Sequence, residues 1–573
     1  VTDTPLLNPS AGRFAPYPTF DPLTGTFSSR EDRYLFLASQ ACYTPGCSPG
    51  GQTYDFQEGH GAKMKLGGFS YNYFGPNGWD FSEDFQMMMA YAPEMGLFST
   101  GANPTSLSSI VASQAKLSGF EPGSYTMSAA LTTSQPVSPD TIATVQTPAM
   151  EQNRPRSISD QFKFSHDFGN GNTLSGGAYV ARMQNGRYTL NAPYRILLQA
   201  KSNPVPIVVS LTTPNGDVLP LTDTQGVFTV PAAPEGDNEE KWFENISAIF
   251  ASDTFKIGKW VLTGGARLAR DSVHGTYHLT QNTDMDGNPR TLYNNFGQVF
   301  LPATNRIQYS NLLRSGMVGA TYLLTDTSSL YAGASFGVSP NHFDVIRHVP
   351  QAARVVQTTR DFNIGYKFAT PFLFLSVQAY HRTFANGAAA FNLANGGTIV
   401  TFGEGQRTNG LLLQADVGPF GGFSVAGTAD YNDGRIIDPT CQLFVDQGGE
   451  QQKNCNNGLH PDRQPNFEYS LRPNYRVDVP FGYLDFWAVF NHVGYHSATA
   501  VSPLGLYNDL GIGAQAGIGQ HWTVTLRGTN VTDEIGLTEG NARIFAGVEN
   551  EGGVILARGI EGHEYNLQVK YQF

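Results

Sequence analysis

The stretch HEYNLQVKYQF at residues 563–573 alternates strictly between apolar and polar side chains. One face takes Tyr565, Leu567, Val569, Tyr571 and Phe573, and the other takes Glu564, Asn566, Gln568, Lys570 and Gln572. Such period-two alternation predicts a β-strand with one apolar and one polar side. Because the pattern continues to Phe573, where a soluble domain usually frays, we expect that residue to be buried or recognised.

The same alternation recurs along the chain, which predicts many amphipathic strands. It is clearest at 79–91, 260–268, 362–379, 423–432, 467–479 and 522–527. Aromatic residues stand near the ends of several of these strands: Trp79, Trp260, Tyr431, Trp522 and Phe573. A soluble propeller would instead show a shared motif at a repeat of about 40–50 residues, and no such repeat is apparent.

The connections alternate between short and long. Tight turns are expected near 75–77, 169–171, 257–258, 326–327, 370–371, 419–421, 480–482 and 519–520. Longer polar segments lie near 96–156, 191–237, 281–305, 342–357, 388–403, 437–462 and 538–562. Short turns at one end and long loops at the other are the layout of a bacterial outer-membrane barrel.

Composition supports this interpretation and excludes others. Charged residues make up only 15% of the 573 residues, aromatic residues make up 12%, and the mean hydropathy is −0.26. No apolar run approaches the roughly 20 residues of a spanning helix. The net charge of −12 argues against nucleic acid as a partner. The sequence therefore predicts an all-β, transmembrane antiparallel β-barrel.

The expected strands number seventeen, because eight tight turns join sixteen strands from about residue 62 and the C-terminal strand adds one. Single-chain bacterial barrels use even numbers. Either residues 30–42 form an eighteenth strand, or further strands precede Val1. The Pro- and Gly-rich composition of residues 1–30 favours the second solution. We therefore expect an extracellular loop region with a possible strand at 1–61, and the barrel at 62–573.

Three segments resemble the barrel of TonB-dependent outer-membrane receptors. They are LYAGASFGVSPN at 330–341, RTNGLLLQADVGPFGGFSVAGTADYNDGRI at 407–436 and TVTLRGTNVTDE at 523–534. Their order and spacing, together with the terminal Phe573, strengthen the resemblance, which covers residues 61–573.

The resemblance implies a 22-stranded barrel with an N-terminal plug, an outer-membrane location with a periplasmic C-terminus, and contact with membrane lipid and lipopolysaccharide. No plug is recognisable in the sequence, so we expect this chain to supply about the last seventeen strands. The plug and first strands would then lie in a separate or preceding segment, which would connect to the TonB–ExbB–ExbD energy-coupling system. Phe573 is expected to act as an assembly signal.

Candidate ligand-binding residues are polar side chains that face the lumen near the strand tops. They are Tyr380, Arg382, Asp430, Asn432, Asn341 and His342. The alternative is that these residues only hydrate the lumen wall or contact a plug, because barrel interiors are polar by default.

The four cysteines fall into two close pairs, Cys42 with Cys47 and Cys441 with Cys455, which suggests two disulfides in outside loops. NTDMDGNP at 282–289 resembles the start of a calcium loop, but it lacks the final Glu and its residues favour a hairpin tip. We expect no cofactor, resident metal or catalytic constellation.

The first functional hypothesis is therefore an outer-membrane receptor for TonB-dependent uptake of a scarce small-molecule nutrient, such as a metal chelate, an oligosaccharide or an aromatic compound. A plugless porin-like diffusion channel and a structural or surface barrel remain the alternatives.

Overall fold

The computed structural model describes most of the chain. The described residues are 4–10, 13–20, 33–37, 40–41, 52–59, 61–99, 104–190, 193–231, 237–341, 343, 355–392, 398–437, 444–445, 451–452, 458–499, 502–540 and 553–572. Among them, no helix is both long and apolar enough to cross a membrane.

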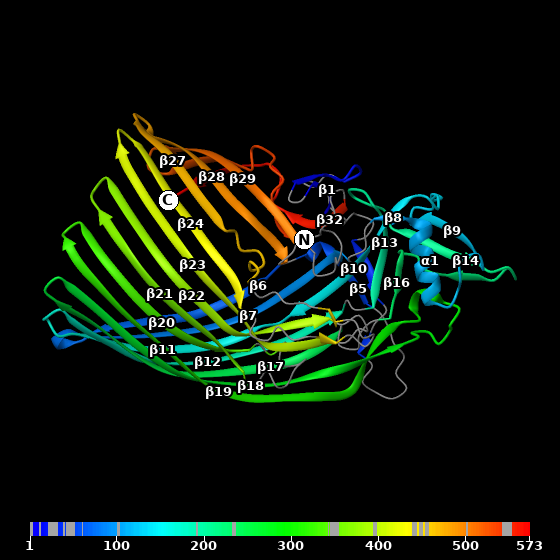
Figure 1. The fold of residues 1–573 in the computed structure, drawn as a ribbon, viewed down its shortest axis with the longest axis horizontal. Coiled ribbons are helices and arrows are strands. Elements are labelled where there is room, and N and C mark those ends of the chain that lie inside the picture. The colour runs from blue at the N-terminus through cyan, green and yellow to red at the C-terminus, as the bar shows by residue number, and fades with distance from the viewer. Residues whose placement is uncertain are drawn as a thin grey trace.

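One antiparallel sheet forms the barrel wall, and its strands lie side by side along the curved body in Figure 1. In order of pairing, its members are β6 (Lys63–Phe74), β7 (Trp79–Ser99), β10 (Ile142–Asn153) with β11 (Arg156–Asp167), β12 (Asn172–Leu190), β17 (Asn238–Ile257), β18 (Trp260–Thr283), β19 (Gly297–Thr325), β20 (Ser328–Pro340), β21 (Val356–Ala369), β22 (Leu373–Asn392), β23 (Thr398–Phe420), β24 (Phe423–Ile437), β27 (Phe467–Val479), β28 (Gly482–Thr499), β29 (Ser502–Ile518), β30 (Trp522–Thr529) and β33 (Glu564–Tyr571).

β10 and β11 are two halves of one long strand, interrupted at Arg154 and Pro155. β11 pairs with the lower part of β7, and β10 pairs with its upper part. β10 then continues onto the top of β12 and onto β13 (Tyr194–Gln199). Counted in this way, the described residues give a wall of seventeen strands, as the sequence predicts.

All eight predicted tight turns are found between the strands of this wall. The first shows why sequence can locate them: Asn77 and Gly78 have φ angles of 59° and 77° in the turn between β6 and β7. Asparagine and glycine adopt this left-handed conformation more readily than other residues do.

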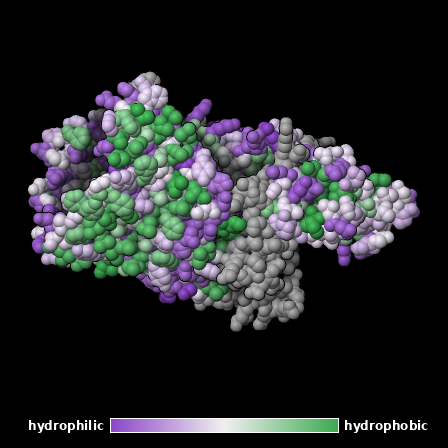
Figure 2. Space-filling view, turned by 90° about the horizontal axis from the view of Figure 1, so that it is seen from above, coloured by the Kyte–Doolittle hydropathy of each residue, from purple (hydrophilic) through white to green (hydrophobic). Residues whose placement is uncertain are grey.

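The wall has one apolar face that points outward. Ile249, Val318 and Ile364 are 62%, 64% and 62% exposed although each lies within a long strand. In water such exposure of isoleucine and valine would be costly, whereas a lipid-facing barrel surface requires it. Figure 2 shows apolar residues covering one face of the wall toward the end that carries the short turns.

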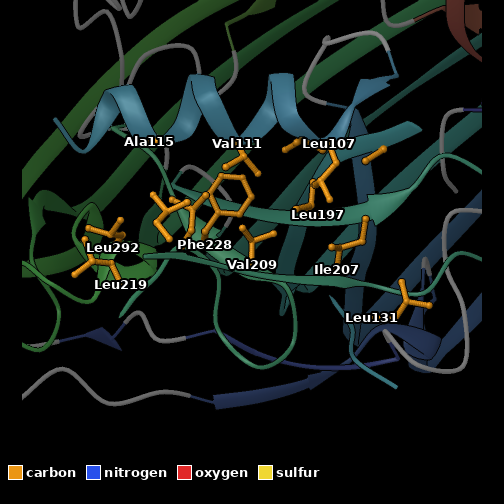
Figure 3. Close-up of a cluster of buried hydrophobic side chains, with 14 residues drawn as sticks. Leu107, Val111, Ala115, Leu131, Leu197, Ile207, Val209, Leu219, Phe228 and Leu292 are labelled. Atoms are coloured by element: carbon orange, nitrogen blue, oxygen red, sulfur yellow. The ribbon is translucent and has the colours of Figure 1, made fainter. Parts of the chain in front are cut away.

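Two of the long connections fold into a layer above the wall, where the sequence predicts only polar loops. It contains α1 (Leu107–Leu117), β9 (Thr126–Leu131), β14 (Ile207–Thr212), β15 (Val218–Pro220) and β16 (Val227–Thr229). Leu107, Val111 and Ala115 recur at helical spacing on α1 and are buried against β14 (Figure 3). Ser106 caps α1 by accepting a hydrogen bond from the Ser109 backbone N–H. The polar-loop prediction is therefore wrong for these two segments.

The N-terminal segment packs on this layer and on the late loops. β1 (Thr4–Ser10) pairs with β2 (Arg13–Pro16) and with β32 (Gly553–Gly559), which also pairs with β31 (Leu537–Gly540). β3 (Tyr34–Leu37) pairs with β5 (Gln52–Asp55) in an antiparallel manner. Leu35 and Leu37 of β3 are fully buried. Within the described residues of the 30–42 segment, β3 pairs with β5, and the two-residue β4 (Gln40–Ala41) pairs with β19 and stands between β33 and β6 in the strand order of the closed barrel.

Candidate binding site at the mouth of the barrel

The inward face of the wall carries polar side chains held by contacts between strands. Tyr380 on β22 donates a hydrogen bond from its hydroxyl to the Asp430 carboxylate on β24, at 3.1 Å. These two strands are not neighbours, since β23 lies between them. Gly410 on β23 makes this contact possible, because a Cβ atom there would collide with the Tyr380 ring that lies across it.

An ion pair extends the Tyr380–Asp430 contact toward β21. Arg382 places its Nε 2.8 Å from an Asp361 carboxylate oxygen, and its guanidinium lies 5.8 Å from the centre of the Tyr380 ring. On the other side, Glu468 on β27 stands directly opposite Asp430 in the strand register. Three carboxylates and one guanidinium therefore face the lumen around Tyr380.

The other predicted ligand-binding residues separate into different places. Asn432 is 5% exposed and donates from its side chain to the Pro465 carbonyl at 2.6 Å, so it fastens a loop at the top of β24. Asn341 is also buried and lies beyond the end of β20, where Nδ2 donates to the Val355 carbonyl. His342 lies outside the described residues. The structure brings together Tyr380, Asp430 and Arg382, but not Asn341.

Asn341 instead lines a cavity of about 440 Å³ at the loop end of the wall. Seven strands line the cavity near their loop ends: β10, β12, β17, β18, β19, β20 and β21. Its lining includes Glu151, Arg187, Glu240, Trp242, Glu244, Tyr309, Asn341 and Gln357. We name this the mouth cavity. Its position follows from the register, since residues at the tops of adjacent strands share one inward face.

Acidic groups dominate the mouth cavity. The Arg187 guanidinium lies 2.7 Å from a Glu151 carboxylate oxygen and 3.9 Å from a Glu240 carboxylate oxygen, so one cation stands between two carboxylates. Glu244 lies on the same inward face of β17 as Glu240. Among the lining residues that the structure describes, three carboxylates therefore face one guanidinium.

Aromatic and amide groups form the rest of the lining. The Trp242 ring stacks on Phe343 with centroids 5.8 Å apart and an interplanar angle of 23°. The Tyr309 hydroxyl donates to the Asn341 carbonyl at 3.3 Å, and Gln357 donates to the Asn341 side-chain oxygen at 3.0 Å. The cavity thus combines a flat aromatic surface with fixed carboxylate and amide oxygens.

A larger cavity of about 720 Å³ lies against the inward side of β30 and β33. Its lining is strongly polar and includes Asp509, Arg527, Asn530, Glu561, Glu564, Asn566 and Gln568. Since β33 is exposed along its whole length, this cavity borders an uncovered strand.

Several other predicted features lie outside the described residues or form turns. Cys42, Cys47, Cys441, Cys455 and Phe573 are outside the described part of the chain. Asp284 accepts hydrogen bonds from the Asp286 and Gly287 backbone N–H groups, which is the hairpin tip that its sequence favours. Within the described residues, no group of three or more potential metal ligands comes together.

Sequence reasoning missed Glu240 and Trp242. They belong to the segment NEEKWFEN at 238–245, where alternation begins, but the pattern alone does not say which strand tops converge. The pattern Glu-x-Trp-x-Glu at 240–244 could have indicated this site, because alternate residues at the start of a strand place all three side chains on one face.

Comparison with known proteins supports the architecture. The family model described as TonB dependent receptor-like, beta-barrel matches residues 10–531. No curated protein matches the chain in a sequence search.

Solved structures resemble it at low sequence identity. The ferric yersiniabactin uptake receptor FyuA from Yersinia pestis is 13% identical with a TM-score of 0.46, over 94% of this chain and 74% of that chain. The ferric-catecholate import receptor Fiu from K12 E. coli is 12% identical with a TM-score of 0.46, over 89% and 75%. The siderophore receptor PiuA from Acinetobacter baumannii is 12% identical with a TM-score of 0.46, over 91% and 78%.

Proposed function

The chain belongs to the TonB-dependent receptor β-barrel family, and we propose from this premise that it imports a scarce solute across the bacterial outer membrane. Members of this family are transporters and receptors rather than enzymes. In the proposal, the solute binds first at the mouth cavity and then passes along the polar lumen. Energy comes from the TonB–ExbB–ExbD system through a plug supplied from outside the strands described above.

The mouth cavity is the observation that favours one class of solute. Three lining carboxylates and one arginine give it a negative balance, which disfavours an anionic metal chelate by like-charge repulsion. Carboxylate and amide oxygens accept hydrogen bonds from hydroxyl groups, and the Trp242 ring offers an apolar face for stacking. We infer that the solute is neutral and rich in hydroxyl groups, as an oligosaccharide is.

A binding measurement on the purified protein tests this inference. Tryptophan fluorescence is followed as maltohexaose, cellohexaose or xylohexaose is added, with ferric citrate as the anionic chelate. At least one neutral oligosaccharide should change the fluorescence saturably, whereas ferric citrate should not. Saturable binding of ferric citrate alone would contradict the choice of solute.

The directions of β6 and β33 support a second part of the proposal, which concerns how the barrel closes. β6 runs toward the short turn at Asn77, and β33 runs the same way, because it follows the long connection after β30. Their long partners among the described strands are β7 for β6 and β30 for β33, the two-residue β4 stands between β33 and β6 in the strand order, and every residue of β6 and β33 is exposed. Two parallel edges can join directly only through one parallel pair, which bacterial barrels of this class, with their even strand numbers, do not use. We therefore infer that an odd number of further full-length strands stands between β33 and β6, and five would give the family's 22.

Cysteine cross-linking in the outer membrane tests this closure. Thr525 and Gln568 are direct partners across β30 and β33, so Thr525→Cys with Gln568→Cys should oxidise to a disulfide and serves as the positive control. Gln568→Cys combined with Ser70→Cys or with Asn72→Cys should give no disulfide, because other strands separate the two edges. High-yield cross-linking of β33 to β6 would indicate the smaller barrel of a diffusion channel.

A further inference from the structure

A strap of described residues crosses the loop end of the barrel wall. It is built on the sheet in which β2, β1, β32 and β31 pair in that order, and β1 and β32 lie at this end in Figure 1. At one side of the strap, β31 contacts β28 and β29. At the other side, the Arg558 guanidinium lies 5.8 Å from the centre of the Phe98 ring of β7, and the Ser202 backbone N–H donates to the Thr19 carbonyl at 3.1 Å. We name residues 4–10, 13–20, 536–540 and 553–560 the strap.

His496 joins β28 to the strap. Its side chain is buried, with an exposed fraction of 5%. The Nε2 atom lies 3.0 Å from the carbonyl oxygen of Leu537 in the strap, and the Nδ1 atom lies 3.1 Å from the carbonyl oxygen of Gly494 on β28. Both ring nitrogens of one buried histidine therefore face backbone carbonyl oxygens.

This arrangement selects the protonated form of His496. A carbonyl oxygen accepts hydrogen bonds but cannot donate one, and a neutral imidazole carries a single N–H. Neutral His496 therefore satisfies one carbonyl and turns the lone pair of its other nitrogen toward the second. The imidazolium donates to both carbonyls, and hydrogen bonds from a charged donor are stronger than neutral ones. The contact is complete at low pH and is lost as the pH rises through the range of about 5 to 8 in which histidine releases its proton.

Charged and titratable groups of the neighbouring elements surround this contact. The Tyr507 ring of β29 meets the His496 ring edge-on, with centroids 6.3 Å apart, and a tyrosine hydroxyl ordinarily stays neutral in this pH range. Glu539 on β31 lies 2.6 Å from the Arg463 guanidinium and 2.7 Å from the Arg558 guanidinium. These ion pairs hold the strap without using the His496 proton.

β28 and the loop before β27 add Asp462, His492 and Tyr495. The His492 Nδ1 atom lies 2.8 Å from the Asn508 side-chain oxygen on β29, not from the strap. His492 therefore titrates in the same pH range without touching the strap, which makes it the matched control for His496.

The strap also forms one wall of the cavity of about 720 Å³ against β30 and β33, because Gly559 and Ile560 line it. The Ile560 backbone N–H donates to the Gly536 carbonyl at 2.8 Å. Gly536 in turn lies directly on the Tyr507 ring, since a Cβ atom at position 536 would stand 2.5 Å from a ring atom. Displacing residues 536 and 537 would therefore move this wall of the cavity.

We propose that His496 is a pH-sensitive latch: its protonated ring holds the strap against β28, and loss of one proton releases the strap and opens the cavity against β30 and β33. The two carbonyl contacts of one buried ring support this role. The inference does not depend on which solute the barrel imports, since it concerns the strap alone.

Hydrogen–deuterium exchange of the detergent-solubilised full chain, followed by peptide mass spectrometry, tests the latch. Exchange of residues 536–540 and 553–560 is measured at pH 5.5 and pH 8.0 and corrected for the intrinsic pH dependence of amide exchange. The parent should lose protection in these segments at least about 10-fold between the two pH values. His496→Phe should show the lower protection at both pH values.

Three further variants make this test specific. His492→Gln should keep the pH dependence of the parent. Glu539→Gln weakens the ion pairs of the strap but leaves the His496 contacts, so protection should fall at both pH values and still depend on pH. His496→Gln, whose amide donates without titrating, should abolish the pH dependence, which keeps the test valid if His496→Phe fails to fold. Equal protection of the parent at both pH values, or an unchanged pH dependence in His496→Gln, would overturn the proposal.

Access to the cavity is measured separately at a single pH. Thr529 lines the cavity, so Thr529→Cys reports how easily a polar maleimide enters it. Labelling at position 529 is followed by peptide mass spectrometry at pH 6.0. Adding His496→Phe should raise the labelling rate several-fold because the strap is released. Equal rates with and without His496→Phe would contradict control of the cavity by the strap.

Discussion

Replacing Gly410 with valine will strongly destabilise the barrel wall. We expect the free energy of unfolding to fall by about 3 kcal/mol or more. The Tyr380 ring occupies the space where a Cβ atom at position 410 would lie. The variant must therefore either strain β23 or expel Tyr380 and break its hydrogen bond to Asp430. Urea unfolding of the membrane-extracted protein, followed by its heat-modified gel mobility, measures the loss.

Two companion variants make this prediction specific. Gly337→Val changes another inward-facing strand glycine, but a Cβ atom there meets no other atom within 4 Å, so its stability should stay close to that of the parent. Adding Tyr380→Ala to Gly410→Val should recover part of the lost stability because it removes the collision. Equal losses in Gly337→Val and Gly410→Val would show that glycine content, not the Tyr380 contact, sets the cost.

Replacing Trp242 with alanine will weaken binding of the neutral oligosaccharide by about 30–100-fold, because truncating a buried aromatic anchor typically costs 2 kcal/mol or more. Glu244→Gln should lower affinity less, since the amide keeps one hydrogen-bond acceptor. Isothermal titration calorimetry of the purified variants provides the values.

Trp260→Ala is the matched control for the cavity tryptophan. Trp260 lies at the short-turn end of β18 and is 48% exposed on the outer face, far from the mouth cavity. Its replacement should leave the dissociation constant unchanged. Loss of binding in Trp260→Ala equal to that in Trp242→Ala would place the solute elsewhere.

Local patterns predicted the wall of the barrel well. The eight turns are marked by Gly, Pro, Asn, Asp or Thr, and strand alternation survives because one face contacts lipid and the other contacts water. The alternating pattern at 564–571 correctly predicted β33, in which every residue is exposed. The layer that contains α1 was missed, because its apolar residues at 107, 111 and 115 lie within a long segment rich in Ser and Thr.

The candidate site was predicted only in part, because it depends on register. That Tyr380 and Asp430 face inward follows from alternation along β22 and β24. Their contact required knowing that Gly410 lies between them on β23, which no local pattern states. The mouth cavity likewise gathers residues as distant as Glu151 and Gln357. Such convergence is a property of the closed arrangement of strands, not of any one of them.

Energy dependence separates a TonB-dependent receptor from a diffusion channel most directly. Uptake of the radiolabelled oligosaccharide that binds the purified protein is compared in cells with and without TonB, at concentrations far below its dissociation constant. Surface binding should be equal in both, while uptake should fall at least about 10-fold without TonB. Equal uptake in the two cell types would contradict active import through this barrel.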